Sequence, residues 1–386
     1  MGEIFVHTQL PQINAKQLKN KTVLLRLDLN LVCREGQVID QTRWDVVVPT
    51  VRMIMSAQPK KVLILSHFGR PSGNDPTYST RILLPTIQKA FPDAVHSAQD
   101  GFDVDATLVL LENVRFDQRE YSNDITLSRG LLKNIDCLVY DAFSVGHRSH
   151  ASVTGVVAHA PEVQFGDHFI QEKKNIDLGM NGQTPTVAIV GGAKVSTKLS
   201  LIESLLDSAD KVIVGGGIAN TFLAAKGIYM GSSLIESDSI TIASAMLKRM
   251  GNKIILPIDG VTEHEQQVTF AKDTLKDSDK IVDVGPSSIE IFLQWIQTAN
   301  TIIWNGPLGF FEKKPFDKGS LIIAQAIAKA DAYTIVGGGD SVSLINELSL
   351  MNDFSYVSTS GGAFLEYVAH GSLKVLDTWS LHHETH

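Results

Sequence analysis

The sequence has little cysteine, no long apolar run and no excess of basic residues. Its two cysteines, Cys33 and Cys137, offer no disulfide framework, which favours free thiols in a reducing compartment. No apolar run approaches the roughly 18 residues that a membrane-spanning helix needs, and the opening MGEIFVHTQL lacks the features of a secretory signal. The formal net charge of −8 argues against a nucleic-acid binder. We therefore expect a cytoplasmic protein without nucleic-acid or membrane partners.

What is present is a globular composition with alternating β-rich and helical segments. The chain is 44% hydrophobic and 20% charged, which is typical of soluble globular proteins, and its 386 residues favour two domains. The alternation predicts the α/β class with parallel sheets. A polar stretch at 166–185, punctuated by glycine and proline and helical in its middle, is the predicted boundary.

Local signals also predict where two helices begin. Pro49 suits the first turn of a helix that continues through Val51 and Ile54. Ser287 and Glu290 form a capping-box pattern ahead of an apolar stretch with helical spacing.

Six β-rich stretches in the second half of the chain run directly into glycine. A glycine turn between a strand and a helix lets backbone N–H groups approach an anion, and the N-terminus of the helix favours negative charge. One such turn can be purely structural, whereas six on one sheet indicate an anionic ligand. The stretches are TVAIVGGAK, KVIVGGGIA, KIVDVGPSS, TIIWNGPLG, YTIVGGGDS and YVSTSGGAF.

The glycines do not match the common nucleotide-binding fingerprints. A dinucleotide-binding site needs G-x-G-x-x-G, but Asn220 and Val342 stand where the third glycine belongs. A G-x-x-x-x-G-K-[ST] loop is missing, as are the H-R-D and D-F-G elements of protein kinases.

Charged residues beside these glycines point to the same kind of ligand. Lys194 and Lys198 are predicted on one face of a helix that opens after VAIVGGAK, where they oppose the helix dipole unless an anion compensates them. Two solvated lysines are the alternative. Asp340 precedes a helical stretch, so it is either an N-cap or a carboxylate that carries Mg²⁺ beside a polyphosphate.

In the first half, by contrast, the strands end on polar and basic residues. A parallel sheet gathers these ends along one edge, and the planar fork of arginine matches carboxylate and phosphate. A small, highly anionic substrate is the predicted partner, with Asp28 and Asn30 available for its hydroxyls, although single surface arginines are often merely solvated. The basic residues are Arg43, His67, Arg70, Arg115 and Arg148.

At this point nine motifs, in order, resemble those of the phosphoglycerate kinase family over nearly the full length of the chain. They are RLDLN, SHFGRP, LENVRF, DAFSVGHRSHAS, VAIVGGAKVSTKL, IVGGGIANTF, WNGPLGFFE, IVGGGDS and STSGGAFLE. The resemblance implies two Rossmann-like domains and reversible phosphoryl transfer between 1,3-bisphosphoglycerate and ADP, giving 3-phosphoglycerate and ATP, in a monomer. It places the phosphoglycerate domain at 1–168, a hinge helix at 169–185, the Mg-nucleotide domain at 186–365 and a segment returning to the first domain at 366–386.

The resemblance also implies roles for individual residues. The substrate-binding set is Asp28, Leu29, Asn30, Arg43, His67, Phe68, Gly69, Arg70, Arg115 and Arg148. The nucleotide-binding set is Lys198, Gly215, Gly216, Gly217, Gly285, Glu312, Gly338, Gly339, Asp340 and Ser341, with Asp340 holding Mg²⁺. The catalytic set is Arg43, Lys194, Gly361 and Gly362.

Several positions depart from the family pattern. Leu29 replaces a usual Phe, Ser144 and Val145 replace a Gly and a small residue, and Ser360 interrupts a triple glycine. The basic residues are retained, so catalysis by alignment and charge neutralisation without a general base is expected. A protein that binds both ligands without turnover is the alternative. Since the ligands occupy different domains, closure about the hinge is expected to bring them together.

Overall fold

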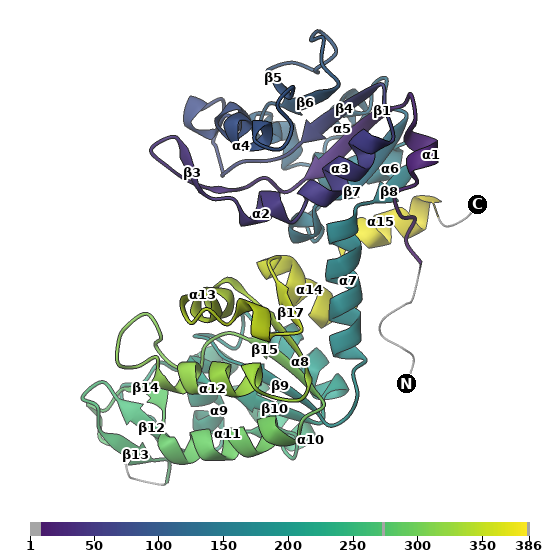
Figure 1. The fold of residues 1–386 in the computed structure, drawn as a ribbon. Helices are drawn as coiled ribbons and strands as arrows, with labels where there is room; N and C mark the ends of the chain where they lie inside the picture. The colour runs from purple at the N-terminus through teal and green to yellow at the C-terminus, as the bar shows by residue number, and fades with distance from the viewer. Residues whose placement is uncertain (1–8, 272–274, 384–386) are drawn as a thin grey trace. The chain divides into compact units, whose positions relative to one another are not determined.

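The computed structural model describes residues 9–271 and 275–383 and divides them into two compact units. The first unit runs to Lys174 and also includes the described residues from Ser372 onward, and the second is Asn175–Gly371. Helix α7, Asp167–Met180, runs from the first unit into the second, as the helical middle of 166–185 predicts (Figure 1). Within the described ranges no helix combines the length and apolarity needed to cross a membrane.

The first unit is built on a parallel six-stranded sheet with the order β5-β6-β4-β1-β7-β8. The central strands are rich in Val, Leu and Ile and are buried along their length, as expected for strands covered on both faces. An antiparallel hairpin, β2–β3, follows β1. The strands are β1 (Thr22–Leu27), β2 (Val32–Arg34), β3 (Gln37–Asp40), β4 (Lys61–Leu65), β5 (Val95–Ser97), β6 (Leu108–Leu111), β7 (Cys137–Asp141) and β8 (Val163–Phe165).

Helices cover both faces of this sheet. Helix α3 lies in front of the strands in Figure 1, where Val51 and Ile54 join the core of β1 and β4, and α5 and α6 lie behind. Pro49 stands in the first turn of α3, which confirms the predicted start. The α-helices are α1 (Ala15–Leu18), α2 (Thr42–Asp45), α3 (Val48–Ser56), α4 (Leu84–Gln88), α5 (Ile125–Leu131), α6 (Val156–His159) and α15 (Lys374–His383). Six short helical turns complete the unit: η1 (Pro76–Tyr78), η2 (Thr80–Leu83), η3 (Val114–Phe116), η4 (Gln118–Glu120), η5 (Phe143–Val145) and η6 (Ala151–Gly155).

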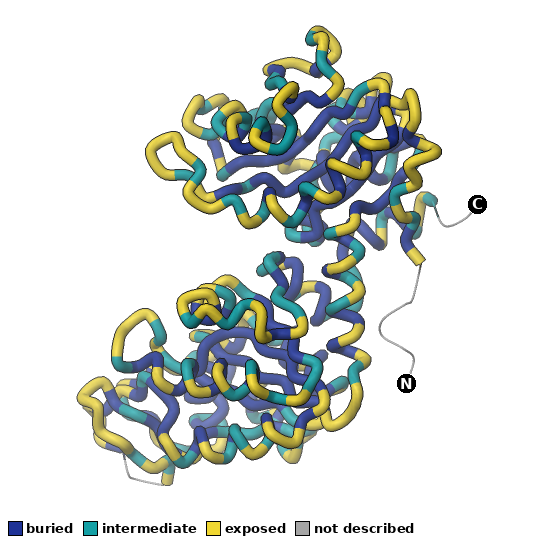
Figure 2. Tube along the Cα trace, in the orientation of Figure 1, coloured by how far each residue is buried: buried dark blue, intermediate teal, exposed yellow. Residues whose placement is uncertain are grey.

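The second unit repeats this plan. Its parallel sheet has the order β11-β10-β9-β15-β16-β17, and β12, β13 and β14 form a separate antiparallel sheet beside it. Figure 2 shows the strands at the centre of the unit buried and its loops exposed. The strands are β9 (Thr186–Val190), β10 (Lys211–Val214), β11 (Ile254–Ile255), β12 (Asp259–Thr262), β13 (Gln267–Thr269), β14 (Ile281–Val284), β15 (Thr301–Asn305), β16 (Tyr333–Gly337) and β17 (Tyr356–Ser358).

The helices of the second unit again flank the sheet. Trp304 on β15 packs with Phe292 and Ile323 of α11 and α12, which cross the front of the sheet in Figure 1. The helices are α8 (Leu199–Ser208), α9 (Gly216–Ala225), α10 (Ile240–Met250), α11 (Pro286–Thr298), α12 (Lys318–Ala328), α13 (Gly339–Glu347) and α14 (Gly361–His370), with turns η7 (Ser237–Ser239) and η8 (Met351–Asp353). The predicted α/β class with two parallel sheets is confirmed.

Each strand order contains a point where the chain reverses the direction in which it adds strands. In the first unit this point lies between β1 and β7, and in the second between β9 and β15. Loops diverge there at the carboxyl ends of the strands, which is where open α/β sheets bind ligands. The loops after these four strands are therefore the expected ligand-binding segments.

The predicted capping box at the start of α11 is wrong. The N-cap is Gly285, and it is Asp259 of β12 that satisfies the free amides, accepting from Ser288 N at 2.7 Å and Ser287 N at 3.1 Å. A carboxylate distant in the sequence thus replaces the local Ser–Glu pair.

This cap predicts unequal effects of two substitutions. Asp259→Ala leaves the buried Ser288 amide and the partly buried Ser287 amide without their charged acceptor and should lower the free energy of unfolding by about 2–3 kcal/mol. Ser287→Ala keeps the backbone amide and should cost less than about 0.5 kcal/mol. Urea unfolding followed by tryptophan fluorescence measures both, and equal effects would contradict the assigned cap.

Candidate active site

Asp28, directly after β1, is the centre of the polar cluster at the carboxyl edge of the first sheet. One oxygen of its carboxylate accepts hydrogen bonds from Arg43 Nη1 and Ser144 Oγ. The other accepts from the Asn30 amide at 3.0 Å and lies 3.9 Å from His67 Nε2. Residues of three loops and of helix α2 therefore meet at one carboxylate, and Ser144 belongs to the loop after β7 across the reversal point.

The charges of this cluster fix its protonation. Burial alone would raise the pKa of Asp28, but the charges of His67 and Arg43 and the hydrogen bonds from Ser144 and Asn30 hold it well below its usual range. Burial, together with the cations Arg26, Arg115 and Arg43, holds the pKa of His67 well below its usual value against the opposing pull of Asp28. The site thus holds Asp28 in its ionised form, while burial disfavours the charged form of His67.

Arg26 lies beneath this cluster and escaped the sequence analysis. It is 1% exposed in the middle of β1, its Nη2 lies 3.4 Å from His67 Nδ1, and its Nε donates to Ser152 Oγ at 3.1 Å. An arginine inside an otherwise apolar strand was the available signal, because a buried guanidinium needs partners.

Gly69 links two further predicted residues of this edge, Asn30 and Arg115. The Gly69 amide donates to Asn30 Oδ1 at 2.8 Å, and its carbonyl accepts from Arg115 Nη1 at 2.6 Å. Gly69 has a φ of +62°, and a Cβ there would overlap the ring of Tyr78. The neighbouring Phe68 is buried, and Leu29 is held through its amide by Ser66 Oγ at 2.9 Å.

Two arginines of this edge have N–H groups that donate no hydrogen bond. Within the described part of the chain, the buried Nε atoms of Arg115 and Arg148 have no hydrogen-bond partner. Burial lowers the pKa of Arg115 to about 10 despite Tyr121, and the charges of Arg148 and Arg26 contribute. Arg70 is exposed on the adjacent loop. Mutually repelling guanidiniums with unused N–H groups are suited to bind an anion.

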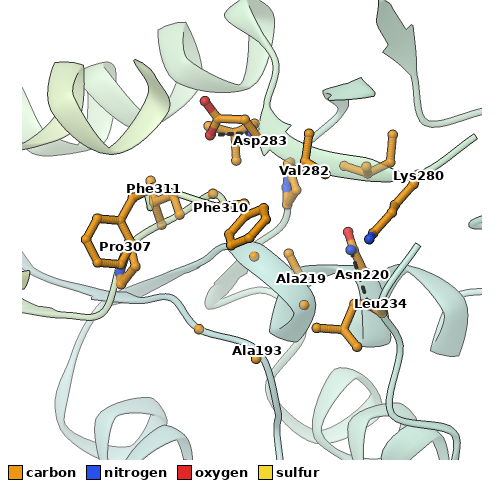
Figure 3. A pocket seen from close by; sticks show the side chains of 18 of the residues that line it. Ala193, Ala219, Asn220, Leu234, Lys280, Val282, Asp283, Pro307, Phe310 and Phe311 are labelled. Carbon is orange, nitrogen blue, oxygen red and sulfur yellow. Dashed lines mark hydrogen bonds between the residues drawn. The ribbon is translucent and has the colours of Figure 1, made fainter. Parts of the chain in front are cut away.

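The second unit carries a cavity of about 520 Å³ beside the carboxyl edge of its sheet. Figure 3 shows Pro307, Phe310 and Phe311 of the loop after β15 on one side, and Ala219, Asn220 and Leu234 on another. The lining is largely apolar, and the charged residues Asp259, Lys280, Asp283, Glu312 and Asp340 stand among it. This is the usual character of a small-molecule pocket.

The loops after β9 and β15 approach so closely that only glycine fits between them. A Cβ at Gly191 would overlap the Pro307 carbonyl, and Gly306, with a φ of +88°, faces the Gly191 carbonyl and Lys198 Nζ. Gly216 and Gly217 line the cavity, and Gly216 has a φ of +64°. Some of these glycines therefore allow the two loops to pack closely, and others line the cavity.

Lys198 lies between these loops and points inward. Its Nζ donates to the Gly191 carbonyl at 2.6 Å. Burial lowers the pKa of Lys198 to about 8, and the Asp340 carboxylate opposes that shift. The protein alone thus leaves this ammonium incompletely neutralised.

The structure corrects the predicted setting of three charged residues. Helix α8 begins only at Leu199 with Lys198 as its N-cap, because residues 192–198 form bends and a turn. Lys194 and Lys198 therefore do not share a helical face. Lys194 is exposed on that segment. Asp340 is not an N-cap, since Gly338 caps α13 and Asp340 lies in the first turn and lines the cavity.

The other predicted residues surround the cavity at different distances. Glu312 lines it, whereas Gly215, Gly285, Gly338, Gly339 and Ser341 are not among its lining residues. Ser341 Oγ accepts from the Gly306 amide at 2.6 Å, so it supports the loop after β15. Gly361 and Gly362 open α14, and a Cβ at Gly361 would meet open space.

Comparisons with known proteins agree on one family. A model of the family described as phosphoglycerate kinase matches residues 13–370. The phosphoglycerate kinase of Sinorhizobium medicae is 40% identical over 376 residues, which is 91% of this chain and 94% of that protein. That of Chloroflexus aggregans is 38% identical over 375 residues, covering 90% and 92%.

Solved structures give the same result. The phosphoglycerate kinase of Coxiella burnetii matches with a TM-score of 0.88 at 35% identity, covering 94% of this chain and 97% of that one. The enzyme from Pyrococcus horikoshii OT3 matches with a TM-score of 0.79 at 28% identity, covering 96% and 98%. From the family match over most of its length and these relatives, the chain belongs to the phosphoglycerate kinase family.

Proposed function

We propose that this phosphotransferase binds its two substrates on separate units. Its reaction is the reversible phosphoryl transfer of glycolysis, in which 1,3-bisphosphoglycerate and ADP give 3-phosphoglycerate and ATP. The unused guanidinium donors of Arg115 and Arg148 support placing the phosphoglycerate at the carboxyl edge of the first sheet. In this assignment Arg43, His67 and Arg70 bind the anion as well, while Asp28 and Asn30 receive its hydroxyl group.

The cavity of the second unit is the proposed nucleotide site. Its apolar walls suit a base, Gly216 and Gly217 admit it closely, and Glu312 is available for the ribose. Lys198 and the amides that open α13 would bind the phosphates. Gly215, Gly285, Gly338, Gly339 and Ser341 would shape or support these contacts.

Asp340 is the proposed holder of Mg²⁺. No group of three or more His, Cys, Asp or Glu side chains is arranged to hold a metal within the residues that the structure describes. A single carboxylate at the cavity nevertheless fits this ion, because Mg²⁺ in nucleotide sites is bound by one or two carboxylates together with substrate phosphates and water. When bound, the ion would neutralise phosphate charge.

The transfer step requires positioning and positive charge. A carboxylate oxygen of 3-phosphoglycerate attacks the terminal phosphorus of ATP, and the bond to the bridging oxygen breaks to leave ADP. The nucleophile is already ionised, so no general base is needed. Lys194, Arg43 and the amides of Gly361 and Gly362 would stabilise the transferring group.

Each turnover also requires the two ligands to meet. Reacting atoms must come within about 3–3.5 Å of each other, and the proposed sites belong to different units. Residues 169–185 would act as the hinge. The phosphoglycerate domain would then be 1–168, the nucleotide domain 186–365 and the returning segment 366–386. We further propose that the enzyme is a cytoplasmic monomer.

The assigned role of Lys194 predicts a selective loss of turnover. Lys194→Ala should lower kcat by about 10²–10³, since it removes one donor that acts on the transferring charge, while the KM values change far less. A coupled assay of ATP-dependent phosphorylation of 3-phosphoglycerate measures this effect. Lys226→Ala is the control. It removes an exposed lysine at the C-terminal end of α9, whereas the N-terminal end of that helix lines the cavity. Near-normal turnover of the Lys194 variant would refute the role.

Lys198 predicts a pH dependence of nucleotide use. Burial lowers its pKa to about 8 in the free enzyme, so the cationic form is present below this value and is lost as pH rises through it. We expect kcat/KM for ADP to fall above about pH 8, a window beyond the ionisation of phosphate groups near pH 6. Lys198→Arg should remove this alkaline fall, whereas Lys226→Arg should retain it. A fall that persists unchanged in Lys198→Arg would assign the titration to another group.

A further inference from the structure

The loop that follows β15 forms a wall of the cavity, and its first residues are tied to the rest of the unit: the Gly306 amide donates to Ser341 Oγ at 2.6 Å, and the Leu308 carbonyl accepts from the Gly216 amide at 2.9 Å. Pro307, Leu308, Phe310 and Phe311 lie on this loop and face the cavity in Figure 3 or line it. The Leu308 amide donates to Ser320 Oγ at 2.9 Å, and the Phe310 amide donates to the Val282 carbonyl at 2.7 Å. The position of this wall therefore depends on what holds the two ends of the loop.

A buried carboxylate holds the far end. Asp283 on β14 is 4% exposed, and its Oδ2 accepts from the amide of Gly319 at 2.9 Å. Gly319 lies in the first turn of α12, where the loop ends. The other oxygen accepts from the Val284 amide at 2.9 Å, which fixes the carboxylate against its own strand.

The near end approaches the same carboxylate. A Cβ at Gly309 would overlap Asp283 Oδ1, and one at Gly319 would lie 2.6 Å from that oxygen. Two glycines ten residues apart therefore admit one side chain between them. Asp283 occupies the point where the two ends of the loop come together.

We propose that Asp283 is a positioning residue that clamps the loop 306–319 in the conformation that closes one wall of the nucleotide cavity. The inference rests on the proposed nucleotide function of this cavity. Asp283 acts through the loop, and the base is recognised by the apolar wall that the loop presents.

The charges around Asp283 make the clamp sensitive to pH. Burial raises the pKa of Asp283 to about 7; the Gly319 and Val284 amides oppose the rise, Asp317 adds to it and Lys318 opposes it. The other charged residues of the cavity are Asp259, Lys280, Glu312 and Asp340. Protonation replaces an acceptor by an O–H donor that faces backbone N–H groups, so the clamp weakens as pH falls through about 7.

Adenosine is the probe of choice, because it carries the base and ribose without a phosphate that titrates near neutral pH. For the wild type, the dissociation constant measured by calorimetry should rise as pH falls from 8 to 6. Asp283→Asn should bind adenosine about tenfold more weakly at pH 8, the effect of one lost charge-assisted hydrogen bond, and should show no such pH dependence. Asp317→Asn is the matched control. It removes a negative charge that adds to the rise in the Asp283 pKa caused by burial, so the midpoint of the pH dependence of adenosine binding should move to lower pH.

Hydrogen exchange tests the clamp without a ligand. Amides of residues 309–319 should exchange faster in Asp283→Asn than in the wild type. Unchanged exchange, or faster exchange with unchanged adenosine affinity, would overturn the proposal. If the wild type does not bind adenosine at all, the nucleotide assignment of the cavity fails and the inference fails with it. Should Asp283→Asn not fold, the midpoints of the wild type and Asp317→Asn decide the question, and identical midpoints would contradict the clamp.

Discussion

The rest of the structure depends on the convergence of strand ends at the carboxyl edges of two parallel sheets. In the first unit this edge brings residues of three loops and of helix α2 together at Asp28. In the second unit it brings the loops after β9 and β15 so close together that only glycine fits at Gly191 and Gly306. Each edge also carries a cationic group that the protein does not fully satisfy. The Nε of Arg115 has no hydrogen-bond partner, and burial lowers the pKa of Lys198. Such groups favour anionic ligands, which agrees with the sites proposed for the two substrates.

The two edges hold their charges differently. In the first unit, arginines repel one another around an ionised Asp28, and the hydrogen bond from Ser144 secures that carboxylate. In the second, backbone groups and glycines carry most of the site, and Lys198 rests on a carbonyl oxygen that a phosphate would replace. A fixed array of cations suits a small rigid acid, while an apolar cavity with a polar mouth suits a nucleotide. The difference between the halves of the chain is thus chemical as well as topological.

Much of this arrangement could be predicted from the sequence, because strand periodicity and strand ends are local signals. The positions of Asp28, His67 and Arg115 at one edge follow from a parallel sheet alone. One error concerns a long-range contact, because Asp259 caps α11 from another strand. The other is local: Gly192, with a φ of +133°, begins the irregular segment that delays α8 until Leu199. Ser144 stood out only as a departure from the family pattern and Asp283 did not stand out at all, because each acts on a residue distant in the sequence. The roles of individual site residues stay predictions.

The division of the two ligands between the units is the central claim, and hydrogen exchange with each ligand alone tests it most directly. With 3-phosphoglycerate alone, protection should appear in the loops at 28–30, 67–70, 113–115 and 143–148. With Mg-ADP alone, it should appear at 192–198, 215–220, 306–312 and 338–341. Footprints confined in this way support two separate sites. Protection of the second set by 3-phosphoglycerate, or of the first set by Mg-ADP, would contradict the account.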